Sequence, residues 1–308
     1  RPLWSVLIPT YNCAHYLKET LASVLAQDPG EDKMEIIVID DYSTKDDPQA
    51  IVKAYGQGRV QFIRQKENVG KSKNYSKGIE MSTGHYIHLL HGDDTINMGF
   101  YKNIESLFKQ NPKVSAAFCR CNYINAESKI FGETDLLSAS EGVLPNFQDK
   151  IAIWQVIQPP SIVFKREVYE TLGTYDKCLK YMEDWEFYVR VSVYFQYAYS
   201  PEKLANYRVF LENSSSQSIK RGKRVPTIDQ VITIIDEYLP SETKEKISKR
   251  RNNAVAIYLL SFIPRLVANK DFKGFIVVTK VFWRYNTRAR LWGRWIRFVI
   301  NHKHFNRI

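Results

Sequence analysis

The stretch Tyr86-Ile-His-Leu-Leu-His-Gly-Asp-Asp94 decides how the rest of the chain is interpreted. Its apolar first part predicts a buried strand, which ends at a glycine and two adjacent carboxylates. Such a strand places the acids at the carboxyl edge of a sheet, where ligands bind in open α/β sheets. Because neighbouring carboxylates repel each other, Asp93 and Asp94 favour a divalent metal, a basic side chain or polar ligand hydroxyls. The alternative is a solvated turn.

Apolar strands and helical periods alternate before this stretch. Strands are predicted at 3–9, 35–39 and 60–64, and helices at 14–27, about 46–55 and 71–81. The alternation predicts βαβ units with right-handed crossovers, hence an α/β fold with a mostly parallel sheet. The second strand also ends on paired acids, Asp40 and Asp41, so all four carboxylates are expected at one edge. This co-location favours a ligand site over a solvated turn.

The later part of the chain is organised differently. Helices are predicted at 100–109, 166–172 and 183–194 and strands at 114–119 and 161–164, whereas 125–150 indicates a loop or a short hairpin. Helical periods return at 226–238, 242–262, 266–284 and 288–301. We therefore expect a catalytic domain over 1–212, a flexible basic loop at 213–225 and a basic helical region over 226–308.

Charge is distributed unevenly along the 308 residues. Residues 1–219 contain 24 Lys+Arg and 27 Asp+Glu, whereas residues 220–308 contain 20 and 6. The basic C-terminal part indicates an anionic partner, either phospholipid or nucleic acid. The hydrophobic content of 44% is sufficient for a core and excludes a disordered protein.

The sequence has cysteines at positions 13, 119, 121 and 178, and their spacings do not form a Cys-x-x-Cys pair. This argues against a structural zinc site or a disulfide scaffold and favours a reducing compartment. The longest nearly apolar run, 254–264, is well short of the roughly 20 residues that span a bilayer. No signal peptide is recognised at the start of the sequence, so we expect a cytoplasmic protein, or one peripheral on the cytoplasmic face of the membrane.

Short motifs along the chain resemble those of family 2 glycosyltransferases. They are Ile8-Pro-Thr-Tyr-Asn12, Val38-Ile-Asp-Asp-Tyr-Ser-Thr44, Glu67-Asn-Val-Gly70, Gly78, Gly84, Leu90-His-Gly-Asp-Asp94, Gly173-x-x-Asp176 and Glu183-Asp-Trp185. The resemblance covers about residues 3–210. It implies a GT-A fold, with a Rossmann-like, mostly parallel sheet flanked by helices, here followed by a C-terminal α-helical extension. It also implies an inverting, nucleotide-sugar-dependent transferase, with its nucleotide-sugar half at about 1–119 and its acceptor half at about 120–212.

The resemblance assigns a donor site. The residues expected to bind the nucleotide sugar are Pro9, Thr10, Tyr11, Asp40, Lys71, Gly92 and Asp93. Asp93 would bind the divalent metal, Mg²⁺ or Mn²⁺, with His91 and Asp94 as candidate further ligands. Such a cation neutralises charge that develops on the leaving nucleoside diphosphate. The alternative for Asp40 is a helix N-cap.

The resemblance also assigns an acceptor side. Asp184 would be the general base that takes the proton from the acceptor hydroxyl, with Glu183 and Trp185 beside it. A partly desolvated pocket would raise the pKa of Asp184 toward that task. The alternatives are that Glu183 and Asp184 cap the helix that follows and that Trp185 packs in the core.

Two positions depart from the family pattern. His91 stands where relatives carry the first acid of an Asp-x-Asp motif, and it is interpreted as a metal ligand, a diphosphate contact or a filler. Phe210 stands where many relatives carry a histidine. Lys71, Lys73 and the loop 220–224 are other sources of positive charge for the diphosphate. The alternative function is therefore a catalytically impaired nucleotide-sugar-binding or scaffolding protein of a glycan assembly complex.

The segment 284–308 has the composition of an interfacial helix. Its apolar stripe comprises Leu291, Trp292, Trp295, Ile296 and Val299, with arginines on the other faces. This pattern predicts contact with an anionic membrane, and the alternative is that the stripe packs on the body of the protein. Nucleic acid is disfavoured because no recognition motif accompanies the charge. We therefore expect transfer from a UDP- or dTDP-sugar to a glycan acceptor that is plausibly lipid-linked.

Overall fold

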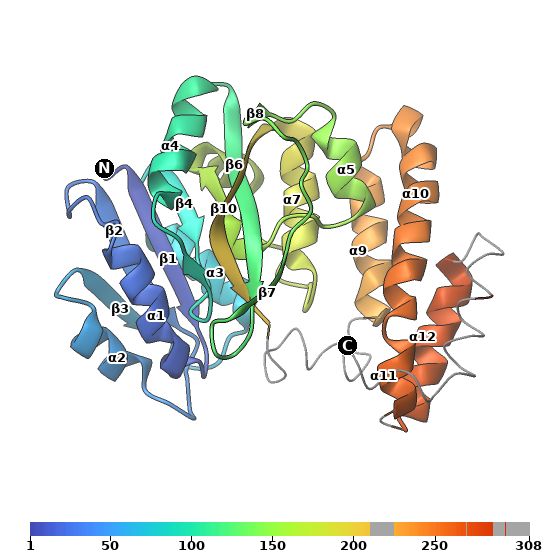
Figure 1. The fold of residues 1–308 in the computed structure, drawn as a ribbon, viewed down its shortest axis with the longest axis horizontal. Helices are drawn as coiled ribbons and strands as arrows, with labels where there is room; N and C mark the ends of the chain where they lie inside the picture. The colour runs from blue at the N-terminus through green and yellow to red at the C-terminus, as the bar shows by residue number, and fades with distance from the viewer. Residues whose placement is uncertain (210–224, 269, 286–292, 294–308) are drawn as a thin grey trace. The chain divides into compact units, whose positions relative to one another are not determined.

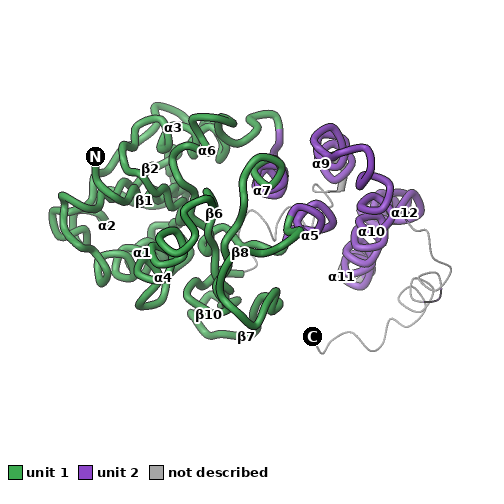
Figure 2. Tube along the Cα trace, turned by 90° about the horizontal axis from the view of Figure 1, so that it is seen from above, with its two compact units in different colours: residues 1–147, 156–178, 190–209 green, residues 148–155, 179–189, 210–308 purple. Residues whose placement is uncertain are grey.

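The computed structural model describes residues 1–209, 225–268, 270–285 and 293. The chain divides into two compact units, which are considered separately (Figure 2). Unit 1 comprises 1–147, 156–178 and 190–209, and unit 2 comprises 148–155, 179–189 and the described residues after 209. The acceptor half expected at 120–212 is thereby divided between the two units.

The first half of unit 1 alternates strands and helices (Figure 1). Its elements are β1 (Trp4–Thr10), α1 (Ala14–Leu25), β2 (Met34–Asp40), α2 (Pro48–Tyr55), β3 (Val60–Arg64), α3 (Lys71–Met81) and β4 (Tyr86–Leu89). The strands are ordered β3-β2-β1-β4, and all neighbours in this part are parallel. The α/β class expected from the sequence is confirmed.

Antiparallel strands extend the sheet in its second half. The elements are β5 (Thr95–Ile96), α4 (Phe100–Gln110), β6 (Val114–Ile124), β7 (Ile130–Glu133), β8 (Gly142–Val143), α5 (Phe147–Ile153), the 3₁₀-helix η1 (Pro159–Ser161), β9 (Ile162–Lys165), α6 (Arg166–Leu172), α7 (Glu183–Tyr194) and β10 (Gln196–Arg208). β9 is antiparallel to both of its neighbours, β4 and β6, whereas β10 is parallel to β6. In the region 125–150, which was expected to be a loop or a short hairpin, β7 pairs with the end of the preceding strand β6. Helix α5, which begins at Phe147, was not expected.

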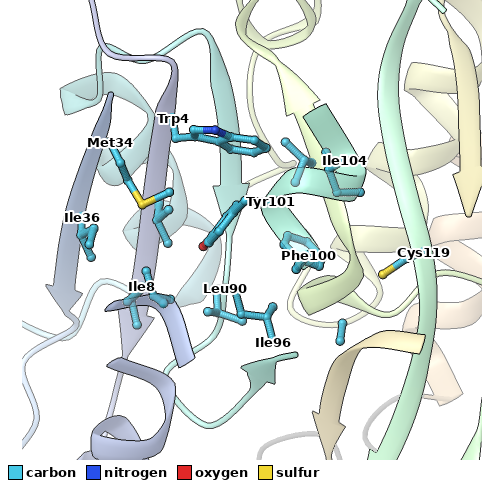
Figure 3. Close-up of a cluster of buried hydrophobic side chains, with 14 of the residues drawn as sticks. Trp4, Ile8, Met34, Ile36, Leu90, Ile96, Phe100, Tyr101, Ile104 and Cys119 are labelled. Carbon is cyan, nitrogen blue, oxygen red and sulfur yellow. The ribbon is translucent and has the colours of Figure 1, made fainter. Parts of the chain in front are cut away.

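The two faces of the sheet are covered by different helices. Side chains alternate along a strand, so Trp4, Val6 and Ile8 of β1 point to one face and join a core to which α1 and α4 contribute (Figure 3). Leu7 points to the other face, where α3 packs. A Cβ atom at Gly78 of α3 would lie only 2.8 Å from the Ile39 Cδ1 atom. Glycine at position 78 therefore allows α3 to approach the sheet closely.

His88 of β4 is a fully buried polar side chain in this unit. Its Nε2 atom lies 3.0 Å from the Pro160 carbonyl oxygen, and its Nδ1 atom lies 3.3 Å from the Tyr101 hydroxyl. Because a carbonyl only accepts hydrogen bonds, the proton of the neutral ring resides on Nε2. Burial lowers the pKa of His88 to about 4.

This shift predicts a pH-dependent stability. The unfolded imidazole titrates near its ordinary pKa of 6.5, so below that pH the unfolded state binds more protons than the folded state. Stability is thus fully present above pH 6.5 and is lost as the pH falls toward 4, by about 2 kcal/mol between pH 7 and pH 5. Urea unfolding at both pH values measures the loss. His88→Gln, which retains a donor for Pro160 but does not titrate, should reduce this pH dependence, and an identical slope in both proteins would contradict the assignment.

The described C-terminal part of unit 2 is helical, as expected. It contains α9 (Val225–Tyr238), α10 (Ser241–Leu260), α11 (Ile263–Ala268) and α12 (Phe272–Tyr285). Apart from Val225, the loop expected at 213–225 lies outside the described residues, as does most of the interfacial segment expected at 284–308. None of the helices described has both the length and the apolar character needed to cross a membrane.

Candidate functional site

The carboxyl ends of β1, β2 and β4 meet in unit 1. The Asp41 N–H donates to the Thr10 carbonyl over 2.9 Å, and the Gly92 N–H donates to the Pro9 carbonyl over 3.0 Å. Both bonds continue the parallel ladders beyond the strands. Pro9 and Thr10 therefore lie between the two acidic turns, and the sheet brings both acid pairs to one edge.

Gly92 allows the second acidic turn to lie directly against β1. A Cβ atom at this position would be 3.2 Å from the Cys13 Sγ atom and 3.3 Å from the Pro9 carbonyl oxygen. The turn is closed by the Asp94 N–H, which donates to the His91 carbonyl over 3.0 Å. The glycine expected to contact the donor thus lies where a side chain would have little space.

Three side chains of this turn form a candidate metal-binding group. One potential ligand atom from each of His91, Asp93 and Asp94 lies within 4.8 Å of the other two. Asp94 is buried, and its Oδ1 atom accepts a hydrogen bond from the Arg208 N–H over 2.8 Å. Its Oδ2 atom has no hydrogen-bond partner among the described residues and lies 3.8 Å from the His91 Nδ1 atom. One buried carboxylate oxygen is therefore available to a cation.

The imidazole of His91 is held in a fixed environment. It stacks on the ring of Tyr75 in α3, with 5.3 Å between the ring centroids and 22° between the ring planes. Of the three interpretations of His91, this arrangement favours a ligand, since the ring is oriented by stacking and lies beside two carboxylates. The change from an acid to an imidazole leaves the group with one fewer negative charge.

The electrostatics of the two acids agree with a cation site. Desolvation raises the pKa of Asp93 to about 6, although the charge of Arg208 opposes the shift. Desolvation and then the charge of Asp93 raise the pKa of Asp94 well above its ordinary value. Two poorly solvated carboxylates thus lie side by side, and a bound divalent ion would offset their repulsion. The imidazole nitrogen and carboxylate oxygens fit Mn²⁺, and the oxygens also fit Mg²⁺.

Arg208, the last residue of β10, fixes the turn of residues 91–94 that contains Asp93 and Asp94. A role for Arg208 was not expected from the sequence. Its side chain is fully buried, and its Nε atom donates to the Asp93 carbonyl over 2.7 Å. Its Nη2 atom donates to the Glu19 carboxylate and its Nη1 atom to the Ser128 hydroxyl, each over 2.8 Å. The guanidinium thus contacts the backbone of Asp93, while the backbone N–H of Arg208 donates to the Asp94 carboxylate.

The first acid pair is directed into the protein. Asp40 is fully buried and accepts hydrogen bonds from the Ser43 N–H and hydroxyl. Asp41 accepts from the N–H groups of Val69 and Gly70 at the start of α3. The N-cap alternative for Asp40 is wrong, because the side chain that caps α2 is that of Asp47. In this arrangement the carboxylates of Asp40 and Asp41 stabilise the loops at the sheet edge.

The remaining expected donor residues occupy the same edge. Tyr11 is exposed, and Lys71 is the first residue of α3. The side chain of Thr10 is buried, and its hydroxyl lies 3.0 Å from the Cys13 Sγ atom. Burial, together with the nearby charge of Asp93, raises the pKa of the Cys13 thiol to about 12, so this cysteine remains protonated.

Trp185 lies in the core of unit 2. It is fully buried, its indole N–H donates to the Ile151 carbonyl over 2.7 Å, and its ring centroid lies 5.5 Å from that of Trp154. The burial and contacts of Trp185 agree with the alternative that it packs in the core. The indole ring is fully buried and its N–H is hydrogen-bonded inside the unit, so the ring is not exposed for stacking on a sugar.

The two acids before Trp185 differ in exposure. Glu183 is buried, whereas Asp184 is partly exposed at the first turn of α7. The Asp184 Oδ2 atom accepts from the Gln155 amide over 2.7 Å, and the Oδ1 atom accepts from the Trp185 N–H over 2.9 Å. The second contact joins adjacent residues inside α7, whereas a helix cap accepts from the N–H two or three residues further along the chain. Asp184 is thus the accessible carboxylate of this motif.

A match to a family model shows the family to which the chain belongs. The model described as "Glycosyl transferase family 2" matches residues 5–173, more than half of the chain. The chain belongs to glycosyl transferase family 2. A similar relative is an uncharacterized glycosyltransferase of Rickettsia typhi, 32% identical over 211 residues. That alignment covers 64% of this chain and 62% of the relative, so the chain spans less than two thirds of the relative's length.

Solved structures share the fold of this family member. Staphylococcus aureus TarS 1–349, in complex with UDP-GlcNAc, has a TM-score of 0.62 and 16% identity over 96% of this chain and 79% of its own. The mannosyltransferase PcManGT of Pyrobaculum calidifontis, in complex with GDP-Man and Mn²⁺, has a TM-score of 0.62 and 18% identity over 98% and 87%. The expected GT-A architecture is confirmed.

Proposed function

We propose that this family 2 member transfers a sugar from a UDP- or dTDP-sugar to a hydroxyl of a glycan acceptor, with inversion at the anomeric carbon. The observation that carries the proposal is the group of His91, Asp93 and Asp94 at the sheet edge, with a buried carboxylate oxygen available to a cation. The complexes of two proteins with this fold, one with UDP-GlcNAc and one with GDP-Man, support a nucleotide-sugar donor.

Each donor-side residue has a distinct task in this proposal. Asp93, with His91 and Asp94, would hold Mg²⁺ or Mn²⁺, and this cation would neutralise negative charge on the leaving diphosphate. The exposed ring of Tyr11 would contact the nucleobase of the donor. Lys71 would add positive charge near the donor phosphates. Asp40, whose oxygens bond to Ser43, contributes by fixing the turn that follows β2.

On the acceptor side, Asp184 is assigned as the general base. Proton transfer requires a carboxylate that the acceptor hydroxyl can reach, and Asp184 is more exposed than its neighbour Glu183. The Gln155 amide orients one oxygen of Asp184 by its hydrogen bond. The carboxylate takes the hydroxyl proton as the oxygen attacks the anomeric carbon.

Calorimetry of UDP binding with and without Mn²⁺ tests the donor site. Mn²⁺ should strengthen UDP binding, and Asp93→Asn should weaken the Mn²⁺-dependent part by roughly tenfold or more, because loss of a direct ligand exceeds the effect of an outer contact. Asp47→Asn is the matched control, since asparagine retains the cap of α2. UDP binding that is indifferent to Mn²⁺ in the wild-type protein would contradict the metal assignment.

A second candidate is a nucleotide-sugar-binding protein of a glycan assembly complex that does not catalyse transfer. It is favoured by His91, which removes one negative charge from the expected acidic motif. The same calorimetry followed by an assay of UDP release separates the two candidates. Metal-dependent binding without UDP release, for any donor and acceptor pair supplied, would select the second candidate.

We propose that the acceptor is a lipid-linked glycan and that the protein works at the cytoplasmic face of a membrane. The support is the excess of 20 Lys+Arg over 6 Asp+Glu in residues 220–308. Anionic lipids attract such a segment, which would bring the site close to an acceptor anchored in the same surface.

A further inference from the structure

Helix α12 of unit 2 has one face in the core and one face in solvent. Its inner side includes Val278, Phe282 and Tyr285, which are buried, and the helix packs on α10 and α11 (Figure 1). A Cβ atom at Gly274 would lie 2.8 Å from the Leu266 Cδ2 atom of α11. The inner contacts fix the rotation of α12, and so determine which residues point outward.

The outward side of α12 carries large apolar residues. Phe272 is 73% exposed, Ile276 is 52% exposed and Val277 is 38% exposed. They recur at spacings of four and five residues, which places them within one arc of the helix. Single exposed apolar residues are ordinary on protein surfaces, but a grouped set with an aromatic residue indicates an interaction surface.

Basic residues share this arc. Lys273, Lys280 and Arg284 are exposed. Each lysine is three or four residues from Ile276 and Val277, and Arg284 follows Val277 by seven residues, two helical turns along the same arc. Arg284 also pairs with Asp229 of α9, so the two lysines are the main source of positive charge. Asp271, the residue before α12, caps the start of the helix, because its Oδ1 atom accepts a hydrogen bond from the Gly274 N–H. We call Phe272, Lys273, Ile276, Val277, Lys280 and Arg284 the α12 outer face.

We propose that the α12 outer face docks on an anionic phospholipid surface. Apolar side chains that alternate with cations around one arc are the composition of helices that lie in the membrane interface. The apolar groups enter the acyl boundary while the long lysine side chains reach the phosphates. The proposal deepens the proposed function by naming the surface through which this chain would meet a lipid-linked acceptor.

The charges of the face favour lipid over the other occupants. A two-fold dimer would bring the same surface of two copies together, and the lysines would then repel one another. Nucleic acid would use the cations but gains little from an exposed phenylalanine, isoleucine and valine without an accompanying recognition motif. An anionic lipid surface satisfies both the charge and the apolar groups.

Vesicle cosedimentation of the full chain tests the docking face. We expect binding to vesicles of phosphatidylcholine mixed with phosphatidylglycerol, weak binding to phosphatidylcholine alone, and weaker binding at high salt. The double substitution Phe272→Ser with Ile276→Ser should lower the affinity by roughly tenfold or more. Lys273→Glu with Lys280→Glu, which retains the apolar groups, should lower it as well.

Phe131→Ser is the matched control, because Phe131 of β7 is 61% exposed and belongs to unit 1. This variant should bind vesicles like the wild-type protein. Wild-type binding by both α12 variants would overturn the proposal, as would equal binding to neutral and anionic vesicles. Self-association that the serine variant abolishes, with no vesicle binding, would assign the face to a second copy. Calorimetry of UDP binding, which the α12 variants should not change, shows separately whether the proposed donor site functions.

Discussion

Replacing Asp184 by asparagine is expected to lower the rate of sugar transfer by roughly 10²–10⁴-fold while the affinity for the donor stays unchanged. The amide has the shape of the carboxylate but does not take a proton from the acceptor hydroxyl. Its oxygen still accepts the hydrogen bond that the Gln155 amide donates to Asp184, so the local packing is retained. Initial rates of UDP release at saturating donor and acceptor, with calorimetry of donor binding, measure both effects.

The neighbouring acid provides the control for this substitution. Glu183 is buried beside Asp184, so Glu183→Gln should reduce transfer much less if Asp184 is the base. Wild-type turnover in Asp184→Asn would remove Asp184 from the role of base.

The parallel half of the sheet could be predicted from the sequence because its signals are local. Each strand from β1 to β4 is a short apolar run, and each helix between them has its own apolar spacing. β10 gave no such signal, since its pairing with β6 shifts register between Ser200 and Lys203 and again between Lys203 and Ala205. A third shift lies between Gln196 and Tyr197. A strand whose pairing is interrupted three times is defined by the neighbour that it pairs with.

The location of the candidate site could be predicted from the sequence, but the directions of its side chains could be predicted only in part. Strand ends place the four acids at one edge, and this inference needs no side-chain geometry. The inward direction of Asp40 depends on hydrogen bonds with Ser43 that only the folded turn provides. Trp185 could not be assigned either, because its partner Ile151 belongs to a helix that the sequence pattern did not indicate. Long-range contacts of this kind have no signature in a single sequence.

Arg208→Met is expected to reduce the free energy of unfolding by about 3 kcal/mol, which is a large fraction of the stability of a typical domain. Methionine retains much of the buried volume but removes the donors to Asp93, Ser128 and Glu19. The Asp93 carbonyl and the neighbouring backbone groups would then lose charge-assisted bonds in a buried place. Chemical unfolding followed by circular dichroism measures the loss. Glu19→Gln is the control, because Glu19 is partly exposed and water can replace its contact.

Arg208→Lys separates the effect on stability from the effect on the acidic turn. Lysine restores the positive charge, so most of the stability should return, but a single ammonium group cannot serve the three directions of the guanidinium fork. The turn would be less well fixed, and Mn²⁺ affinity measured by calorimetry without nucleotide should fall by roughly tenfold, as for other residues that orient metal ligands. A stable lysine variant with wild-type Mn²⁺ affinity would restrict Arg208 to folding. Weakened Mn²⁺ binding in a stable variant would instead tie the end of β10 to the metal site, across the 114 positions that separate Arg208 from Asp94.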